Sequence, residues 1–182
     1  ADNQVSHFVK HWGKNASYGV FMKGGGEGGR IERNLLVCTT DGNISHFGSR
    51  VGISLGGGLT DKPYCSVKDC IYEHIKGVVI NNVIMNCNDF GIDNNRAIQS
   101  VIAHNTVINT YGIGIRGIGH EGAAVVTVER HLVVQLEHQS AEGQEGGVLP
   151  VGSWLVQRPS TLPDQLLEAL VTAATHQNPL LV

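Results

Sequence analysis

The chain has 182 residues, 41% of them hydrophobic, which suffices for one domain with a continuous core. Its formal net charge is −3 at pH 7, which argues against nucleic acid as a partner. A strongly acidic polymer would have to meet a local cluster of cations instead. We find neither an apolar run of membrane-spanning length nor a signal peptide, so no membrane partner is expected.

Residues 1–18 precede the first regular pattern. Val5, Phe8 and Trp12 have roughly helical spacing, although the segment also fits the remnant of a repeat. We expect a helix or strand that covers the open end of the structure that follows, because an uncovered sheet edge is prone to association.

A strand is predicted over Gly19 to Lys23, and it is followed by the string GGGEGG at 24–29. This string matches GxGxxG, but a dinucleotide fingerprint opens a helix, and the next residues, 30–34, read as another strand and a bend. We therefore reject nucleotide binding at this position.

Two patterns then repeat along the chain. The first has an aliphatic residue, a bend residue three positions later and a second aliphatic residue after two more. Its copies are Ile31-Asn34-Leu36, Val79-Asn82-Ile84, Ile102-Asn105-Val107 and Val128-His131-Val133. The second is a glycine before an aliphatic residue, at Gly19-Val20, Gly52-Ile53, Gly91-Ile92 and Gly112-Ile113.

The period is 105 − 82 = 23 residues between equivalent asparagines. Alternating apolar residues at this period predict coils of short strands, and thus an all-β parallel β-helix of about four coils. The aliphatic residues form inward columns. The asparagines form a ladder, because an amide at a bend bonds neighbouring backbone and tolerates a left-handed conformation. A third column runs through Thr39, Cys87 and Thr110, with Cys87 as a small core residue.

The second coil carries an insertion loop at 57–76, and long loops on a regular scaffold often carry function. Cys65 and Cys70 flank the polar residues SVKD within this loop. A disulfide there is favoured over a metal site, because a metal would need more ligands than His74 alone.

The repeat pattern ends near residue 138. We therefore assign residues 1–138 to the β-helix domain, with residues 1–18 as its N-terminal cap. Residues 139–182 are predicted to be a linker and a C-terminal capping segment. A helix is expected after Pro163, with Leu166, Leu167 and Leu170 on its apolar face.

The repeat region resembles the bacterial right-handed parallel β-helix proteins of the pectate-lyase-like superfamily, and among these the chondroitinase-B and alginate-lyase branch. The likeness covers Ser17 to about Val134. It rests on the stretches GVFMKGGGEGGRIERNLLVC, VGISLGGG, CSVKDCIYEH and GVVINNVIMNCNDFGIDNN…VIAHNTVINTYGI. It implies a right-handed β-helix, a scaffold that serves enzymes and non-enzymes alike.

Aligning the glycine-aliphatic pairs predicts which residues share the outward face of one sheet. The pairs point inward, so every second neighbour points outward. This face collects Lys23, Ser54, Asp93, Asn95 and Arg116, and the insertion adds Tyr72 and His74.

These residue types suit β-elimination in a uronic-acid polymer, which needs a base for the C5 proton and a cation for the substrate carboxylate. The resemblance implies Lys23, Arg116 and Asp93 as catalytic residues, and calcium held by oxygens such as those of Asp93 and Asn95. Ser54, Asn95, Tyr72 and His74 are the expected substrate-binding residues. The Asn-Glu-Glu calcium ligand set of that branch is not found on one face of this chain.

We thus expect a secreted or periplasmic lyase for an acidic polysaccharide. The alternative is a non-catalytic glycan-binding or structural β-helix module, or a fragment of a larger enzyme.

Overall fold

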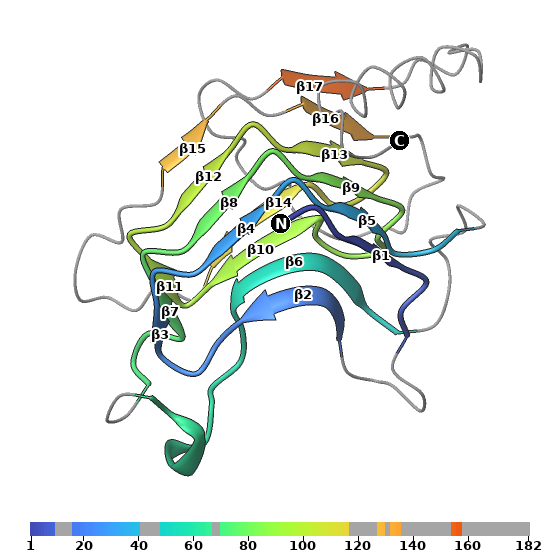
Figure 1. Ribbon diagram of the computed structural model, residues 1–182. Coiled ribbons are helices and arrows are strands. Elements are labelled where there is room, and N and C mark those ends of the chain that lie inside the picture. The colour runs from blue at the N-terminus through green and yellow to red at the C-terminus, as the bar shows by residue number, and fades with distance from the viewer. Residues whose placement is uncertain are drawn as a thin grey trace.

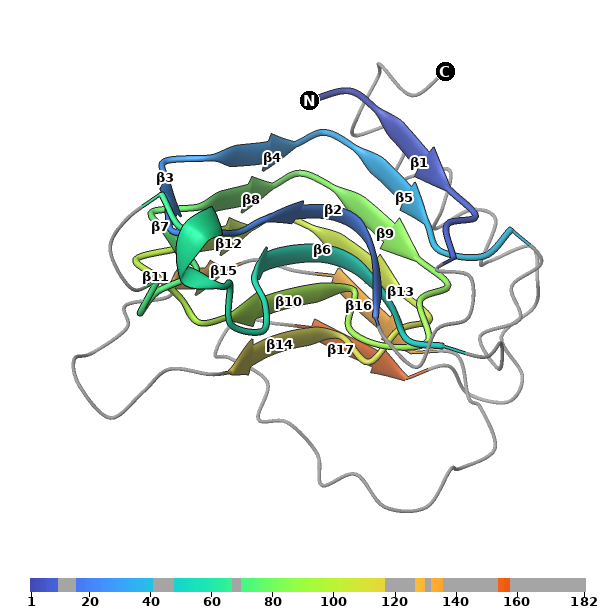
Figure 2. The ribbon, with the colours of Figure 1, turned by 90° about the horizontal axis from the view of Figure 1, so that it is seen from below.

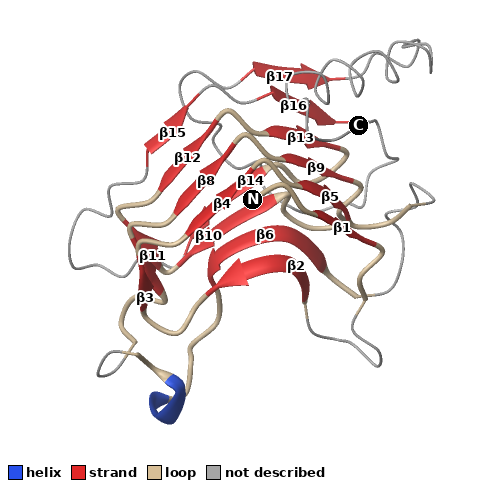
Figure 3. Ribbon diagram, viewed as in Figure 1, coloured by secondary structure: helices blue, strands red, loops and turns tan. Residues whose placement is uncertain are grey.

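The computed structural model describes residues 1–9, 16–40, 48–66 and 70–116, with the backbone of 127–129, 132–135 and 154–157. Within these residues the chain is all-β, and the helical part is a single 3₁₀ turn, η1 (Lys62–Tyr64), drawn in blue in Figure 3. No described helix has the length and apolar character needed to cross a membrane.

The strands form four sheets in which every pairing is parallel (Figure 1). Sheet A contains β1 (Gln4–Ser6), β5 (Leu35–Val37), β9 (Val83–Met85), β13 (Thr106–Ile108), β16 (Leu132–Gln135) and β17 (Trp154–Gln157). Sheet B contains β14 (Ile113–Arg116), β10 (Ile92–Asn95), β6 (Arg50–Gly56) and β2 (Ser17–Met22). Sheet C contains β11 (Ala97–Ile98), β7 (His74–Ile75) and β3 (Gly26–Glu27). Sheet D contains β15 (Thr127–Glu129), β12 (Val101–Ala103), β8 (Val78–Ile80) and β4 (Arg30–Glu32).

The chain visits these sheets in a fixed order. After β2 in sheet B come β3 in C, β4 in D and β5 in A, and the next two coils repeat the order. Figure 2 shows the successive strands stacked on one another. This arrangement is consistent with a parallel β-helix, as the repeat pattern predicts, because each short strand pairs with its equivalent in the next coil.

The predicted inward columns occupy the core. Ile31, Val79 and Ile102 are in register across sheet D, and Leu36, Ile84 and Val107 are in register across sheet A. All six side chains are buried in one hydrophobic cluster. The continuation of the two columns through Val128 and Val133 is confirmed for the backbone register.

The asparagine ladder is also present. Asn34 donates its backbone N–H and Nδ2 to Oδ1 of Asn82, at 3.0 and 2.9 Å, and Asn82 donates the same two groups to Oδ1 of Asn105, both at 2.9 Å. The left-handed residue, however, is the one before each ladder asparagine, namely Arg33, Asn81 or His104, with φ of 51°, 56° and 54°. The ladder therefore uses the amide for hydrogen bonding, and its neighbour makes the bend.

The glycine before each aliphatic residue is needed because the backbone passes close to the core. A Cβ at Gly52 would lie 2.4 Å from Cγ2 of Ile84, and one at Gly91 would lie 2.4 Å from Cγ1 of Val107. Neither distance leaves room for a carbon atom. The glycines therefore let sheet B approach sheet A.

Both pairs of cysteines form disulfides. Cys65–Cys70 closes part of the insertion, as expected from its polar setting. Cys87 is a buried core residue, as predicted, and in addition it is bonded to Cys38 of the preceding coil, with Cα atoms 4.9 Å apart. Cys38 follows β5 directly and the paired strand β9 ends two residues before Cys87, so strand pairing brings the thiols together. Disulfides are typical of oxidising compartments.

The N-terminal end of the chain is as expected, and the C-terminal region is described only in part. The N-terminal segment covers the first coil with a strand, β1, which extends sheet A next to β5. Residues 10–15, including Trp12, lie outside the described part of the chain. The predicted linker and C-terminal helix also lie outside it, but β17 falls in this region and pairs with β16.

Candidate functional site

The outer face of sheet B is defined by Phe21, Ser54, Asp93, Asn95 and Arg116. The predicted register is present, because Phe21 pairs with Ser54, Ser54 with Asp93, and Asn95 with Arg116. The alternation of inward and outward residues implies that Ser54 and Asp93 are exposed to solvent. Both are nevertheless fully buried. The Ser54 hydroxyl donates to the backbone oxygen of Gly56 at 3.0 Å, so it has a local partner.

The structure brings Asp93 and Arg116 together as a two-point ion pair. Nε of Arg116 donates to Oδ1 of Asp93 at 2.9 Å, and one terminal nitrogen donates to Oδ2 at 2.8 Å. The side chain of Asp93 is 0% exposed and that of Arg116 is 49% exposed. The guanidinium also lies over the ring of Phe90, 5.2 Å from its centroid, so its orientation is fixed from two sides.

This pair limits what Arg116 can do chemically. The hydrogen bonds that Arg116 donates to Asp93 raise the pKa of Arg116 above its ordinary value, with burial opposing the shift. An arginine of this kind stays charged and is unsuited to accept a proton. Among the described residues, the edge of the guanidinium that faces away from Asp93 has no hydrogen-bond partner, and its N–H groups suit an incoming carboxylate.

Lys23 lies one residue beyond β2, on the same side as Gly57. A Cβ at Gly57 would be 3.6 Å from Cδ and 3.7 Å from Nζ of Lys23, so the side chain lies along this backbone. Lys23 is half-buried, and among the described residues its ammonium group has neither a hydrogen bond nor an ion pair. Lys23 therefore offers a half-buried amine that the described residues leave without a polar partner.

The aromatic residues of this face were not predicted as a site. Tyr18, Phe90 and Tyr111 each precede the glycine of a glycine-aliphatic pair, which is the sequence signal that identifies them. Tyr18 and Phe21 have ring centroids 5.8 Å apart, and Phe90 packs over Gly114. Phe21 and Tyr111 remain 57% and 53% exposed. Burial, and next the charge of Asp93, raise the pKa of the Tyr18 phenol, so this hydroxyl stays protonated.

His74 does not belong to this face. It lies on β7 in sheet C, in register with Gly26 and Ala97, and its ring is packed against Gly29 and Gly77. The side chain is 3% exposed, and both ring nitrogens lack a hydrogen-bond partner. Burial lowers the pKa of His74, so the ring is a neutral core residue rather than a group that a polysaccharide can reach.

The insertion therefore ends earlier than predicted. Tyr72 is its last half-buried residue, and Glu73 is fully buried at the start of the return to β7. The Glu73 carboxylate accepts from the backbone N–H of Thr60 and of Gly24, at 2.6 and 3.3 Å, and also from the Thr60 hydroxyl. Glu73 thus anchors the base of the insertion to the first and second coils.

The described residues do not fit the calcium site that the resemblance implies. They contain no group of three or more His, Cys, Asp or Glu side chains placed to hold a metal. In addition, Arg116 occupies both oxygens of Asp93.

Comparison of the chain with protein-family models, with curated proteins and with solved structures gave no match. The site is therefore interpreted from its geometry.

Proposed function

We propose that the chain is a right-handed parallel β-helix similar to the pectate-lyase-like proteins, and that the outer face of sheet B binds an acidic polysaccharide outside the cytoplasm. The observation that carries this proposal is the half-exposed guanidinium of Arg116, held in place by Asp93 and Phe90 on a sheet whose opposite edge strand carries the exposed ring of Phe21. A fixed guanidinium recognises a carboxylate with two hydrogen bonds.

The aromatic rings supply the second part of the binding surface. A pyranose ring presents C–H groups on its faces, and rigid aromatic side chains bury such apolar surface at a small cost in conformational entropy. Phe21 and Tyr111 lie on the two outermost strands of sheet B or next to them. A sugar chain that crosses the strands from Phe21 in β2 would reach β14, whose last residue is Arg116.

The binding test compares polyuronates with neutral polysaccharides of similar length by calorimetry. We expect binding of the polyuronate that weakens as salt is added, since the recognised group is a carboxylate. Phe21→Ala should weaken it at least fivefold. Tyr64→Ala removes an aromatic ring that is exposed in the insertion and serves as the matched control.

Arg116 is tested in a double variant, because replacing it alone would leave the buried carboxylate of Asp93 unpaired. Arg116→Gln with Asp93→Asn should reduce affinity for the polyuronate and remove most of its salt dependence. Equal affinity for charged and neutral polysaccharides in the native protein would rule out this proposal.

Elimination is the second candidate function, and the unengaged amine of Lys23 favours it. In this reaction a base takes the C5 proton, the C4–O bond breaks, a C4=C5 double bond forms and the departing oxygen acquires a proton. Lys23 would accept the C5 proton while Arg116 neutralises the carboxylate.

The test is the ultraviolet absorbance of the unsaturated product on polyuronates and glycosaminoglycans, with and without added calcium. Lys23→Ala should lower turnover at least a hundredfold and leave folding unchanged, whereas the exposed Lys62→Ala should not. Binding without any unsaturated product would leave the glycan-binding function standing and exclude the lyase.

A further inference from the structure

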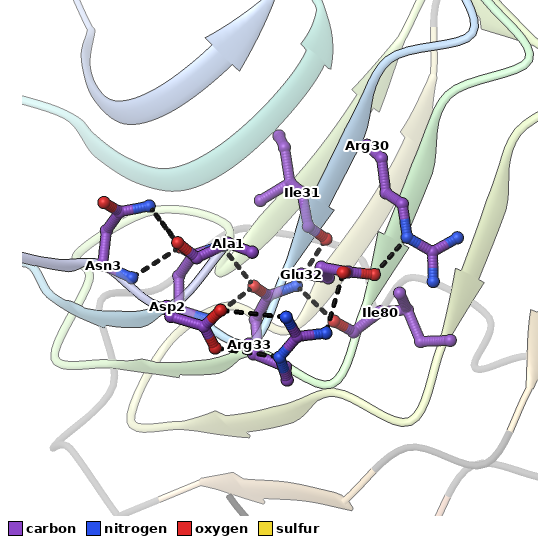
Figure 4. Close-up of polar contacts among 10 residues, drawn as sticks. Ala1, Asp2, Asn3, Arg30, Ile31, Glu32, Arg33 and Ile80 are labelled. Carbon is purple, nitrogen blue, oxygen red and sulfur yellow. Dashed lines mark hydrogen bonds and ion pairs between the residues drawn. The ribbon is translucent and has the colours of Figure 1, made fainter. Parts of the chain in front are cut away.

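Two arginines of the described part of the chain form two-point ion pairs, and they differ in what remains open. Arg33 binds both oxygens of Asp2, at 2.8 and 2.9 Å, and its third nitrogen binds Glu32 at 2.8 Å (Figure 4). Carboxylates of the chain therefore lie on both sides of that guanidinium. Arg116 makes the same two-point contact with Asp93 and has no second acidic partner among the described residues. Of the two arginines, Arg116 is the one that suits an anion from outside.

The open side of Arg116 fits one carboxylate. Its Nε and one terminal nitrogen bind Asp93, so the N–H groups that remain belong to the two terminal nitrogens. Two of these N–H groups are parallel at the end of the guanidinium and match the two oxygens of a single carboxylate. The ring of Phe90 covers one face of the guanidinium, with its centroid 5.2 Å from the central carbon. The carboxylate therefore binds at the end of the group rather than on that face.

A second acidic residue, Asp89, lies beside this arginine. It is half-buried in the turn between β9 and β10, one residue before Phe90. Its carboxylate accepts a hydrogen bond from the backbone N–H of Phe90 at 2.8 Å and another from the Ser49 hydroxyl. Each carboxylate oxygen has two acceptor positions, so Asp89 is fixed in place and can accept further hydrogen bonds.

The charges around Arg116 do not make a cationic site. After the hydrogen bonds to Asp93, the negative charges of Asp93 and Asp89 also raise the pKa of Arg116. After burial, the same two carboxylates raise the pKa of the Tyr18 phenol, while Arg116 lowers it. Two anions and one cation therefore act on this part of the outer face. A carboxylate is held there by the paired N–H groups of Arg116 and not by an excess of positive charge.

The other cations near sheet B do not change this balance. Arg50 is 6% exposed and donates to the backbone oxygen of Phe8 at 3.1 Å, and Lys23 lies along the backbone of Gly57. Neither of them contributes to the pKa shifts of Tyr18 and Arg116. A ligand with more than one negative charge per sugar would therefore meet repulsion beside Arg116.

We propose that this site selects uronic-acid chains with free hydroxyl groups and rejects sulfated chains, and that Asp89 determines this specificity. The inference rests on the proposed polysaccharide-binding function and names the class of polysaccharide. The carboxylate of one sugar binds the end of Arg116, and a hydroxyl of the chain donates to Asp89. A sulfate ester in place of that hydroxyl has no hydrogen to donate and carries a negative charge, so Asp89 repels it.

The probes are three forms of one polygalacturonate preparation of the same chain length: unmodified, O-acetylated, and O-sulfated to the same degree. Acetylation blocks hydroxyl groups without adding charge, whereas sulfation blocks them and adds charge. By calorimetry at low salt, we expect the sulfated form to bind at least tenfold more weakly than the unmodified form, and the acetylated form to lie between them. Added salt should narrow the gap between the sulfated and acetylated forms, because that gap is electrostatic.

Asp89→Asn removes the charge and keeps an oxygen for the N–H of Phe90. It should reduce the gap between the sulfated and acetylated forms to threefold or less. Asp61→Asn changes the net charge equally at an exposed position of the insertion, and as the matched control it should leave the gap unchanged. If Asp89→Asn lowers stability, the order of the three forms on the native protein still decides the question.

A second measurement needs no ligand. Asp89→Asn should lower the pKa of Tyr18 in a spectrophotometric titration, with Tyr18→Phe as the reference, because the charge of Asp89 raises that pKa. A residue that only supports the turn would not produce this shift.

The outcomes separate this inference from the function on which it rests. Binding of the sulfated form as tight as that of the unmodified form would overturn the inference and leave the proposed function standing. A gap that Asp89→Asn leaves unchanged would do the same. If none of the three forms binds, the proposed function itself fails, and the inference fails with it.

Discussion

Thr60 donates both its backbone N–H and its hydroxyl to the carboxylate of Glu73, each across 2.6 Å. Thr60 lies near the start of the insertion and Glu73 at its end. The pair therefore closes the base of the loop, while Cys65–Cys70 fastens the part further out. Two independent links thus give a long insertion a defined connection to the scaffold.

Replacing Glu73 should loosen the insertion. In Glu73→Ala, three donors on Thr60 and Gly24 lose their acceptor, so we expect a loss of about 1–3 kcal/mol in the free energy of unfolding. Limited proteolysis should then cut within 57–66. Asp61→Ala is the control, because Asp61 is exposed and makes no side-chain capping hydrogen bond. Equal protease resistance in the two variants would contradict the anchoring role.

The ladder should matter most in the middle of the stack. Oδ1 of Asn105 accepts two hydrogen bonds from Asn82, and its Nδ2 donates to Val79 and Ala103. We expect Asn105→Ala to cost about 1–3 kcal/mol in urea denaturation, because buried backbone groups lose partners. His104→Asn changes the exposed left-handed neighbour to a residue that tolerates this conformation and should cost less than about 0.5 kcal/mol. Similar costs for both variants would count against the ladder.

The close approach at Gly52 predicts a large effect of one methyl group. In Gly52→Ala the new Cβ would lie 2.4 Å from Ile84 and 2.5 Å from the backbone oxygen of Gly91. Neither group can move away freely in a packed core, so we expect a loss of about 2–3 kcal/mol or more in thermal or urea unfolding. Gly58→Ala places the same methyl where nothing lies within 4 Å and should be nearly neutral. A neutral Gly52→Ala would show that the coils are less tightly packed there.

His74 should make stability depend on pH in a defined window. Burial lowers its folded-state pKa below the ordinary value of 6.5, so the unfolded chain binds a proton that the folded protein resists. Stability contributed by the neutral ring is present above about pH 6.5, falls as the pH drops toward the folded-state pKa and levels off below it. His74→Leu should remove this part of the pH dependence, measured as urea midpoints from about pH 8 to 5. If His74→Leu and the native protein showed the same pH dependence of the urea midpoint, this role of His74 would be contradicted.

The repeated features could be predicted from the sequence because periodicity places equivalent residues in register. Ile31, Val79 and Ile102 form the expected column, and the glycine-aliphatic pairs fix the alignment of Ser54 with Asp93. The alignment does not determine how much of each outward-facing side chain is exposed to solvent, however. Asp93 faces away from the core and is nevertheless buried, because Arg116 covers it.

Features that occur once were harder to predict. The bond between Cys38 and Cys87 depends on where β5 and β9 end, and alternation alone does not locate those ends. His74 follows a loop of irregular length, so no repeat assigns it to the interior. Residues 1–6 contain the asparagine and the second aliphatic residue of the pattern, at Asn3 and Val5, but not the aliphatic residue three positions before the asparagine, which is why only a covering segment is expected there.

The disulfide between Cys38 and Cys87 limits how far unfolding that starts at the N-terminus can spread. In a stack where each coil contacts only its neighbours, fraying begins at an end and moves inward one coil at a time. A force that pulls on the N-terminus would detach β1 from β5 and would then detach the strands of the first coil in turn. The first coil can separate from the second only as far as Cys38 while this bond is intact, because the bond joins the ends of β5 and β9. Under tension in an oxidising medium, the chain ahead of Cys38 is therefore the length that yields, and the stack behind it carries the load.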